Sequence, residues 1–185
     1  MNKLLILGSI AFDQIETPFG KSNAIMGGSA NYIALAAAQF EVPSAVVSIV
    51  GDDYPQDYLN LLAQRHIDIS GIEIVHGGKT LFWSGKYRND MNQRDTLDTQ
   101  LNVLANFKPV VPEAFRNAEV LLLGNLHPTL QMDVLDQMLS RPKLVVMDTM
   151  NYWMNHTWDL LMEVIAKSDV ITINDEEARQ LSGEY

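Results

Sequence analysis

Short apolar runs alternate along this chain with segments of helical periodicity, and this alternation restricts the fold more than any other feature. The runs that read as strands are 4–7, 45–50, 120–123, 144–147 and 170–173. Several lack every-second-residue alternation, as expected when helices cover both faces of a parallel sheet. Helical patterns lie near 29–40, 55–65, 129–139, 157–167 and 175–182. The sequence therefore predicts an α/β fold with a Rossmann-like, doubly wound, mostly parallel sheet.

Two polar segments, about 12–24 and 80–102, interrupt this rhythm. In the second, Leu81, Trp83, Gly85 and Tyr87 alternate with their neighbours in the manner of an exposed strand. We interpret both segments as a small antiparallel β-lid over the strand ends; the alternative is an ordinary surface hairpin. With 185 residues and no evident linker, residues 1–185 are expected to form one domain.

The charge balance excludes some partners. A net charge of −10 argues against nucleic acid and against an anionic membrane surface, because both are bound through clustered Lys and Arg. The chain has no cysteine, which excludes disulfides and thiolate chemistry. No apolar stretch approaches the roughly 18 residues of a membrane-spanning helix. The apolar run at 4–7 is too short for a signal peptide, so we expect a cytoplasmic protein.

Polar residues follow the predicted strands. Asp13 comes after the first strand, His127 after the third and Asp148 at the end of the fourth. The pair Gly27-Gly28 opens a helix that carries Asn31. Ligands of open α/β sheets bind at the carboxyl ends of the strands, so these groups together indicate a polar-lined cleft. Individually, each also fits a simpler role as a solvated loop, a turn or a helix cap.

Asn174 and Glu177 follow the last strand at the start of a helical segment. Backbone N–H groups and the helix dipole favour anions at such a position, which suits the phosphates of a metal nucleotide. The spacing Asn-x-x-Glu also resembles a capping box, in which the two side chains satisfy each other's backbone donors. Both interpretations can hold at once, and the sequence leaves them open.

Taken together, these motifs resemble the ribokinase/PfkB family of ATP-dependent carbohydrate and nucleoside kinases. The matching pieces occur in family order over nearly the whole chain. They are Gly8…Asp13, Gly27-Gly28-Ser29-Ala30-Asn31, Val47-Ser48-Ile49-Val50-Gly51-Asp52-Asp53, Asp148-x-x-Asn151 and Asn174-Asp175-Glu176-Glu177-Ala178. The resemblance implies a ribokinase-like domain with a β-lid, a small-molecule sugar or nucleoside substrate, ATP and Mg²⁺ as cofactors, and a homodimer formed through the lid.

The resemblance also implies roles for single residues. Substrate contacts fall on Asp13, Gly27, Gly28, Asn31, Trp83, Arg94, His127 and Asp148. Of these, Trp83 and Arg94 would close over the substrate from the lid. Asn174 would serve the nucleotide phosphates and Glu177 the Mg²⁺ ion, in the latter case through water because Mg²⁺ keeps much of its hydration.

One departure from the family pattern concerns catalysis. Family members are longer, and their glycine-rich anion hole and catalytic aspartate follow the Asn-x-x-Glu motif; no equivalent occurs here. The resemblance therefore implies a truncated chain, with its general base beyond Tyr185 and little or no activity alone. We expect a sugar kinase; the alternatives are a nucleoside kinase of the same family and a non-catalytic polyol-binding or dimerisation module.

Overall fold

The computed structural model describes residues 3–89, 91 and 94–184. Its large sheet has the strand order β11-β10-β9-β1-β5-β6, and every neighbouring pair is parallel. The strands are β1 (Leu4–Leu7), β5 (Ser44–Gly51), β6 (Ile67–Val75), β9 (Val120–Leu123), β10 (Leu144–Asp148) and β11 (Val170–Thr172). The predicted parallel sheet is confirmed, and β6 is an edge strand that the sequence did not reveal.

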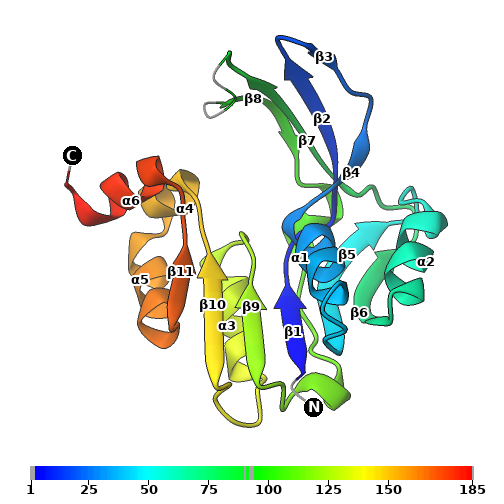
Figure 1. The fold of residues 1–185 in the computed structure, drawn as a ribbon, viewed down its shortest axis with the longest axis vertical. Helices are drawn as coiled ribbons and strands as arrows, with labels where there is room; N and C mark the ends of the chain where they lie inside the picture. Colours follow the sequence, from blue (N-terminus) through cyan, green and yellow to red (C-terminus); the bar gives the residue numbers. More distant parts are fainter. Residues whose placement is uncertain (1–2, 90, 92–93, 185) are drawn as a thin grey trace.

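Helices lie on both faces of this sheet (Figure 1). Leu4 and Ile6 of β1 point to one face, where they pack with α1 (Ser29–Ala38) and α2 (Gln56–Gln64). Leu5 and Leu7 point to the other, where α3 (Pro128–Asp136) and α5 (Trp158–Lys167) contribute to the core. This arrangement confirms the doubly wound fold. The remaining helices are α4 (Asn151–His156), α6 (Asp175–Ser182) and the 3-10 turns η1 (Asn102–Asn106) and η2 (Glu113–Phe115).

A second, small sheet rises from the edge of the large sheet at which the strand arrows point (Figure 1). It consists of β2 (Ala11–Thr17), β3 (Gly20–Lys21), β4 (Ile25–Gly27), β7 (Leu81–Tyr87) and β8 (Arg94–Gln100). We expected it to be antiparallel, whereas β2 and β7 are parallel and the sheet is mixed. Both strands leave the large sheet at the same edge, and they therefore run in the same direction.

The register of the small sheet decides which side chains share a face. Trp83 pairs with Asp13 on one side and with Thr99 on the other, and paired residues point to the same side of a sheet. A bulge after Ser84 then places Thr96 beside Gly85 and Arg94 beside Tyr87. We call this side the Trp83 face; its members are Asp13, Ile15, Trp83, Gly85, Tyr87, Arg94, Thr96 and Thr99.

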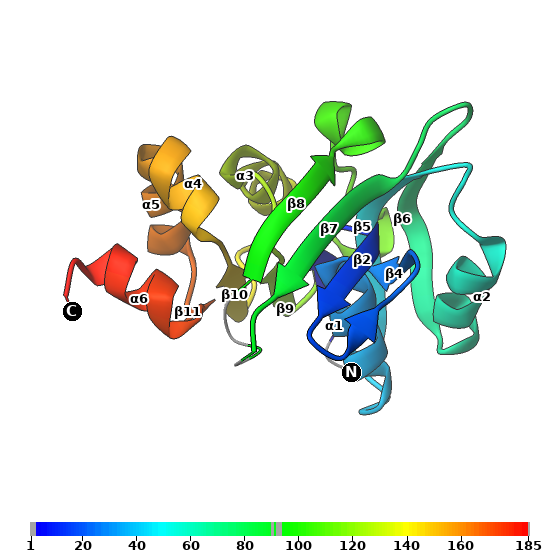
Figure 2. The same ribbon diagram turned by 90° about the horizontal axis from the view of Figure 1, so that it is seen from above.

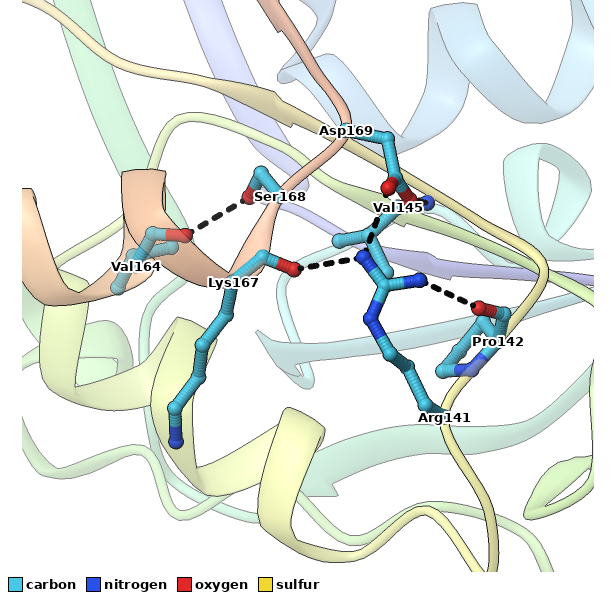
Figure 3. A network of polar contacts seen from close by, with 7 residues as sticks. All are labelled: Arg141, Pro142, Val145, Val164, Lys167, Ser168 and Asp169. Atoms are coloured by element: carbon cyan, nitrogen blue, oxygen red, sulfur yellow. Dashed lines mark hydrogen bonds and ion pairs between the residues drawn. The ribbon is translucent and has the colours of Figure 1, made fainter.

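A polar network fixes β11 to β10 at the opposite, amino edge of the large sheet (Figure 3). Arg141 donates to Asp169 Oδ1 at 2.7 Å, and the backbone N–H of Val145 donates to Asp169 Oδ2 at 2.8 Å. These two contacts lower the pKa of the Asp169 carboxyl below its ordinary value, the guanidinium having the larger effect. Because the network sets where β11 begins, it also sets where the chain reaches α6.

Candidate functional site

The predicted site residues gather at the carboxyl edge of the large sheet. Six of them lie there: Asp13 and Asn31 beyond β1, His127 beyond β9, Asp148 at the end of β10, and Asn174 and Glu177 beyond β11. Strands β1 and β11 are separated by β9 and β10, and at about 4.8 Å per strand they lie roughly 14 Å apart. The residues thus follow one another along this edge from β11, at the end of the sheet, to β1, in its middle.

Asp13 rests directly on the glycine pair. A Cβ on Gly27 would lie 2.2 Å from Asp13 Cγ, so only glycine leaves room for the carboxylate. Gly28 has φ of 87°, and a Cβ there would lie 2.3 Å from the Ser9 carbonyl oxygen. Burial raises the pKa of Asp13, and the hydrogen bond from the Gly28 N–H opposes that shift. The two glycines therefore position a half-buried carboxylate at the start of α1.

Asn31 is fully buried in the first turn of α1. Its Nδ2 donates to the Gly27 carbonyl at 2.6 Å and to the Tyr54 hydroxyl at 3.1 Å. Its Oδ1 has no hydrogen-bond partner among the described residues, which leaves one acceptor available beside Asp13. Burial raises the pKa of Tyr54 to about 12, so this phenol stays protonated at neutral pH. Sequence reasoning missed Tyr54, since no local pattern links it to Asn31.

His127 caps α3. The backbone N–H of Thr129 donates to Nδ1 of His127 at 3.1 Å, so the neutral ring carries its proton on Nε2. The ring packs edge-on against Trp153, with centroids 5.1 Å apart. Trp153 in turn donates from Nε1 to Asn125 at 2.8 Å. His127 is thereby fixed in one orientation between the ends of β1 and β10.

The carboxyl group of Asp148 has a pKa well above its ordinary value. Burial, followed by the negative charge of Glu177, raises its pKa to about 6. Backbone N–H groups of Thr149 and Asn125 and the positive charge of Arg94 act in the opposite direction. Gln131, buried in α3, donates to the carbonyls of Gly124 and Asp148 at 3.0 Å each and so holds the ends of β9 and β10 together. No local sequence pattern indicates this role for Gln131.

Asn174 and Glu177 form a complete capping box at α6. Asn174 Oδ1 accepts from the Glu177 N–H at 2.8 Å, and Glu177 Oε2 accepts from the Asn174 N–H at 3.0 Å. The capping interpretation of the Asn-x-x-Glu spacing is therefore confirmed. Glu177 is buried, and its negative charge contributes to the raised pKa of Asp148.

Trp83 and Arg94 come to this edge from the small sheet. Both lie on the Trp83 face, as does Asp13. Because the charge of Arg94 acts on Asp148, this face is turned toward the end of β10. The view from above agrees, with β8 on the side of β10 and β2 on the side of α1 (Figure 2). Residues from two sheets thus surround the same edge.

Two surface hollows of the described residues lie elsewhere. One of about 740 Å³ is lined by Glu16, Lys86 and Asp95 near the tip of the small sheet. The other, of about 260 Å³, is lined by Phe12, Phe82 and Thr80 near its base. Of these lining residues, Glu16, Lys86, Asp95, Phe12 and Phe82 belong to the face opposite to Trp83. Within residues 3–89, 91 and 94–184, no group of three or more His, Asp or Glu side chains could hold a metal ion, and no helix is long and apolar enough to cross a membrane.

Comparison with known proteins gives consistent matches. Residues 1–185 match the sequence model of the pfkB family of carbohydrate kinases. Cytidine kinase from Thermococcus kodakarensis is 26% identical over 191 residues, covering 99% of this chain and 65% of that protein. A Methanocaldococcus jannaschii nucleoside kinase, described as an archaeal member of the ribokinase family, superposes with a TM-score of 0.78 at 19% identity, over 99% of this chain and 64% of that one.

A third relative was solved with a bound ligand. The Burkholderia thailandensis nucleoside kinase in complex with inosine has a TM-score of 0.76 at 16% identity, over 98% of this chain and 63% of that one. The structural similarity confirms the ribokinase-like fold. The chain spans 65% of the length of the cytidine kinase and similar shares of the two nucleoside kinases.

Proposed function

The chain belongs to the pfkB family of carbohydrate kinases, and from that premise we propose that it serves ATP-dependent phosphorylation of a hydroxyl group on a nucleoside. The sequence favoured a sugar and kept a nucleoside as the alternative. We now reverse that order, because the similar proteins include a cytidine kinase and nucleoside kinases. A free sugar is the second candidate, since the family is described by its carbohydrate kinases.

The observation that carries the proposal is the placement of Asp13. Its carboxylate lies on Gly27 and Gly28, beside the available Oδ1 of Asn31. A carboxylate can accept hydrogen bonds from two hydroxyl groups at once, and the amide oxygen can accept a third. Neighbouring hydroxyls occur on a ribose and on other sugars. We assign Asp13, Gly27, Gly28 and Asn31 to this part of the substrate, with His127 beside them.

The phosphate end of the proposed site lies at α6. Asn174 and the first N–H groups of this helix suit an anion, and the acidic pair Asp148 and Glu177 suits a divalent cation. Mg²⁺ binds through one or two carboxylates and keeps several waters, so the absence of a three-carboxylate cluster in the described residues fits it. Burial and, after it, the charge of Glu177 raise the pKa of Asp148; a bound cation would relieve the part that comes from like-charge repulsion.

Phosphoryl transfer depends mainly on positioning and on stabilising charge. When bound, Mg²⁺ supplies positive charge to the phosphates of ATP. The residues of this chain hold the substrate at Asp13 and Asn31, and Arg94 and Trp83 cover it from the small sheet, which acts as a lid. We assign no proton acceptor among the residues that the structure describes.

A homodimer through the small sheet is part of the proposal. The face opposite to Trp83 carries Phe12 and Phe82, which line the smaller hollow, and Leu97 on the neighbouring strand is 55% exposed. We expect size-exclusion chromatography with light scattering to show a dimer, and Leu97→Asp to give a monomer. A wild-type protein that stays monomeric at high concentration would contradict this assembly.

Calorimetry tests whether Asp13 binds the hydroxyl groups of a nucleoside. We expect the protein to bind a nucleoside and Asp13→Asn to weaken that binding about 10-fold to 100-fold, the usual value of a hydrogen bond to a charged group. Asp98→Asn is the matched control, because Asp98 lies on the opposite face of the same small sheet. A coupled ADP-release assay over nucleosides and sugars then identifies the phosphate acceptor. Binding that is insensitive to Asp13→Asn would overturn the proposal.

A further inference from the structure

The indole of Trp83 lies flat on the backbone of the small sheet. A Cβ built on Gly85 would lie 2.1 Å from Cη2 and 2.4 Å from Cζ2 of Trp83, so the six-membered ring of the indole covers Gly85 directly. At the other end of the indole, Nε1 donates to the Thr96 hydroxyl at 3.3 Å. The glycine at position 85 leaves room for the ring to lie along the strand, and the hydrogen bond to Thr96 holds it there.

The free side of this ring is turned toward the candidate site. One side of the indole is covered by the sheet at Gly85, and the other belongs to the Trp83 face, which also carries Asp13 and Arg94. Asp13 is the direct neighbour of Trp83 across the β2–β7 pair. Arg94 lies close enough to Asp148 to affect the pKa of its carboxyl. The flat aromatic surface therefore lies next to the carboxylate assigned to the substrate hydroxyls.

We propose that the Trp83 indole is the stacking platform for the nucleobase of the substrate. This inference rests on the nucleoside kinase function proposed above and adds the part of the protein that recognises the base. An indole held flat offers a large π surface, and each base that stacks on an aromatic side chain gains substantial binding energy irrespective of its identity. A free sugar has no such planar ring. The platform therefore distinguishes nucleosides from sugars while Asp13 binds the hydroxyls that both share.

Gly85 offers a test that leaves the indole in the protein. Gly85→Ala places a methyl group where the ring lies, so the indole must leave its position although its chemistry is unchanged. Ser84→Ala is the matched control, because Ser84 is the preceding residue on the opposite face and changes by only one hydroxyl. Trp83→Ala removes the platform and Trp83→Phe keeps a smaller one. Circular dichroism and thermal unfolding establish that each variant is folded.

The experiment compares affinities for cytidine, inosine and ribose by calorimetry. We expect Trp83→Ala and Gly85→Ala to weaken binding of both nucleosides by about 5-fold to 100-fold, the range for loss of one base stack. Ribose affinity should change less than about twofold. Trp83→Phe should lie between, and Ser84→Ala should match the wild type. A Trp153→Phe/Trp158→Phe protein, in which Trp83 is the remaining tryptophan, should show fluorescence quenching with cytidine but not with ribose.

The outcomes separate the two proposals. Nucleoside binding that is unaffected in Trp83→Ala, or a quenching signal that is absent when cytidine binds, overturns the platform and leaves the kinase assignment standing. An equal loss of ribose and nucleoside affinity also overturns it, because the indole would then contact the sugar. A wild-type protein that binds ribose but no nucleoside overturns the nucleoside assignment itself. If Gly85→Ala does not fold, the Trp83 variants and the fluorescence measurement decide.

Discussion

At the scale of single residues, the sequence predicts some features of the carboxyl edge, such as its capping box, but not the electrostatic influence of Arg94 on Asp148. The capping box of Asn174 and Glu177 follows from local spacing, and the structure has both of its hydrogen bonds. The influence of Arg94 on Asp148 links residues 54 positions apart in different sheets. Local patterns carry no information on such a pair, because only the docking of the small sheet brings the two charges together.

Asp148 makes stability depend on pH. Its folded pKa of about 6 lies above the ordinary value of 3.8, so the native state binds this proton more tightly than the unfolded chain does. The resulting stabilisation is complete below pH 3.8 and is lost as the pH rises through 6. We predict that Asp148→Asn, which cannot ionise, is more stable than the wild type by about 2 kcal/mol at pH 8 and gains nothing at pH 3.5.

Urea denaturation without divalent cations measures this difference. The control is Asp57→Asn, an exposed residue in the first turn of α2 for which no such gain is expected. A stability gain for Asp148→Asn that is equal at both pH values would contradict the assignment of the raised pKa to this residue.

His127 is predicted to contribute as a helix cap. His127→Ala removes the acceptor for the Thr129 N–H and should lower the free energy of unfolding by about 1 kcal/mol. His127→Asn keeps an acceptor of similar reach and should retain most of that stability, while it loses the Nε2 donor. Chemical denaturation of the three proteins measures the difference; equal losses in both variants would show that packing against Trp153, and not the cap, stabilises this position.

At the scale of elements, two were missed for identifiable reasons. Strand β6 has isoleucines at two odd-numbered positions, Ile67 and Ile69, and then at two even-numbered positions, Ile72 and Ile74. The change occurs because the register of β6 against β5 shifts in between. The shift breaks the every-second-residue pattern that identifies strands. Helix α4 has only six residues, too few for helical periodicity to appear. By contrast, strands β1, β5 and β9, which are continuous apolar runs, were predicted to within a residue.

The small sheet is tied to the large sheet at Thr80, just before β7. The buried Thr80 hydroxyl donates to Asp53 Oδ1 at 2.7 Å and accepts from the Gly51 N–H at 3.0 Å. The Thr80 N–H donates to the same Asp53 oxygen, and Asn102, after β8, donates to the Thr80 carbonyl. The chain entering β7 and the chain leaving β8 are therefore both anchored at Thr80.

We predict that Thr80→Val destabilises the protein by about 2 kcal/mol, since it leaves the buried Gly51 N–H without an acceptor. Thr80→Ser keeps the hydroxyl and should cost much less. Hydrogen exchange of the β7 amides reports whether the loss is local to the small sheet. If β7 exchanges as slowly in Thr80→Val as in the wild type, this anchor does not hold the small sheet.

At the scale of the whole molecule, one face of the large sheet is unevenly covered. Helices α1 and α2 pack over β1, β5 and β6, whereas β9 and β10 have no helix of the described residues in front of them (Figure 1). On that side Leu144 is 37% exposed and Val170 is 43% exposed. Apolar side chains exposed together on a sheet face bind other apolar surfaces.

We predict that the 185-residue chain binds the apolar dye ANS and that Val170→Lys lowers this binding, because the charge interrupts the exposed apolar face. Val110→Lys is the control, as Val110 is 70% exposed in a loop. Titration with the dye measures both. Equal dye binding by the wild type and Val170→Lys would show that this face is not the apolar surface that the dye detects.

The sequence by itself determined the class of the fold and the set of polar residues at the strand ends. Apolar runs long enough to be buried on both faces specify parallel strands, and the residues after such strands must meet at one edge. The tertiary structure alone decided that β2 and β7 are parallel, that Trp83 shares a face with Asp13, and that the charge of Arg94 affects the pKa of Asp148. These features depend on the register between distant strands, where a shift of one residue would turn every side chain to the other face.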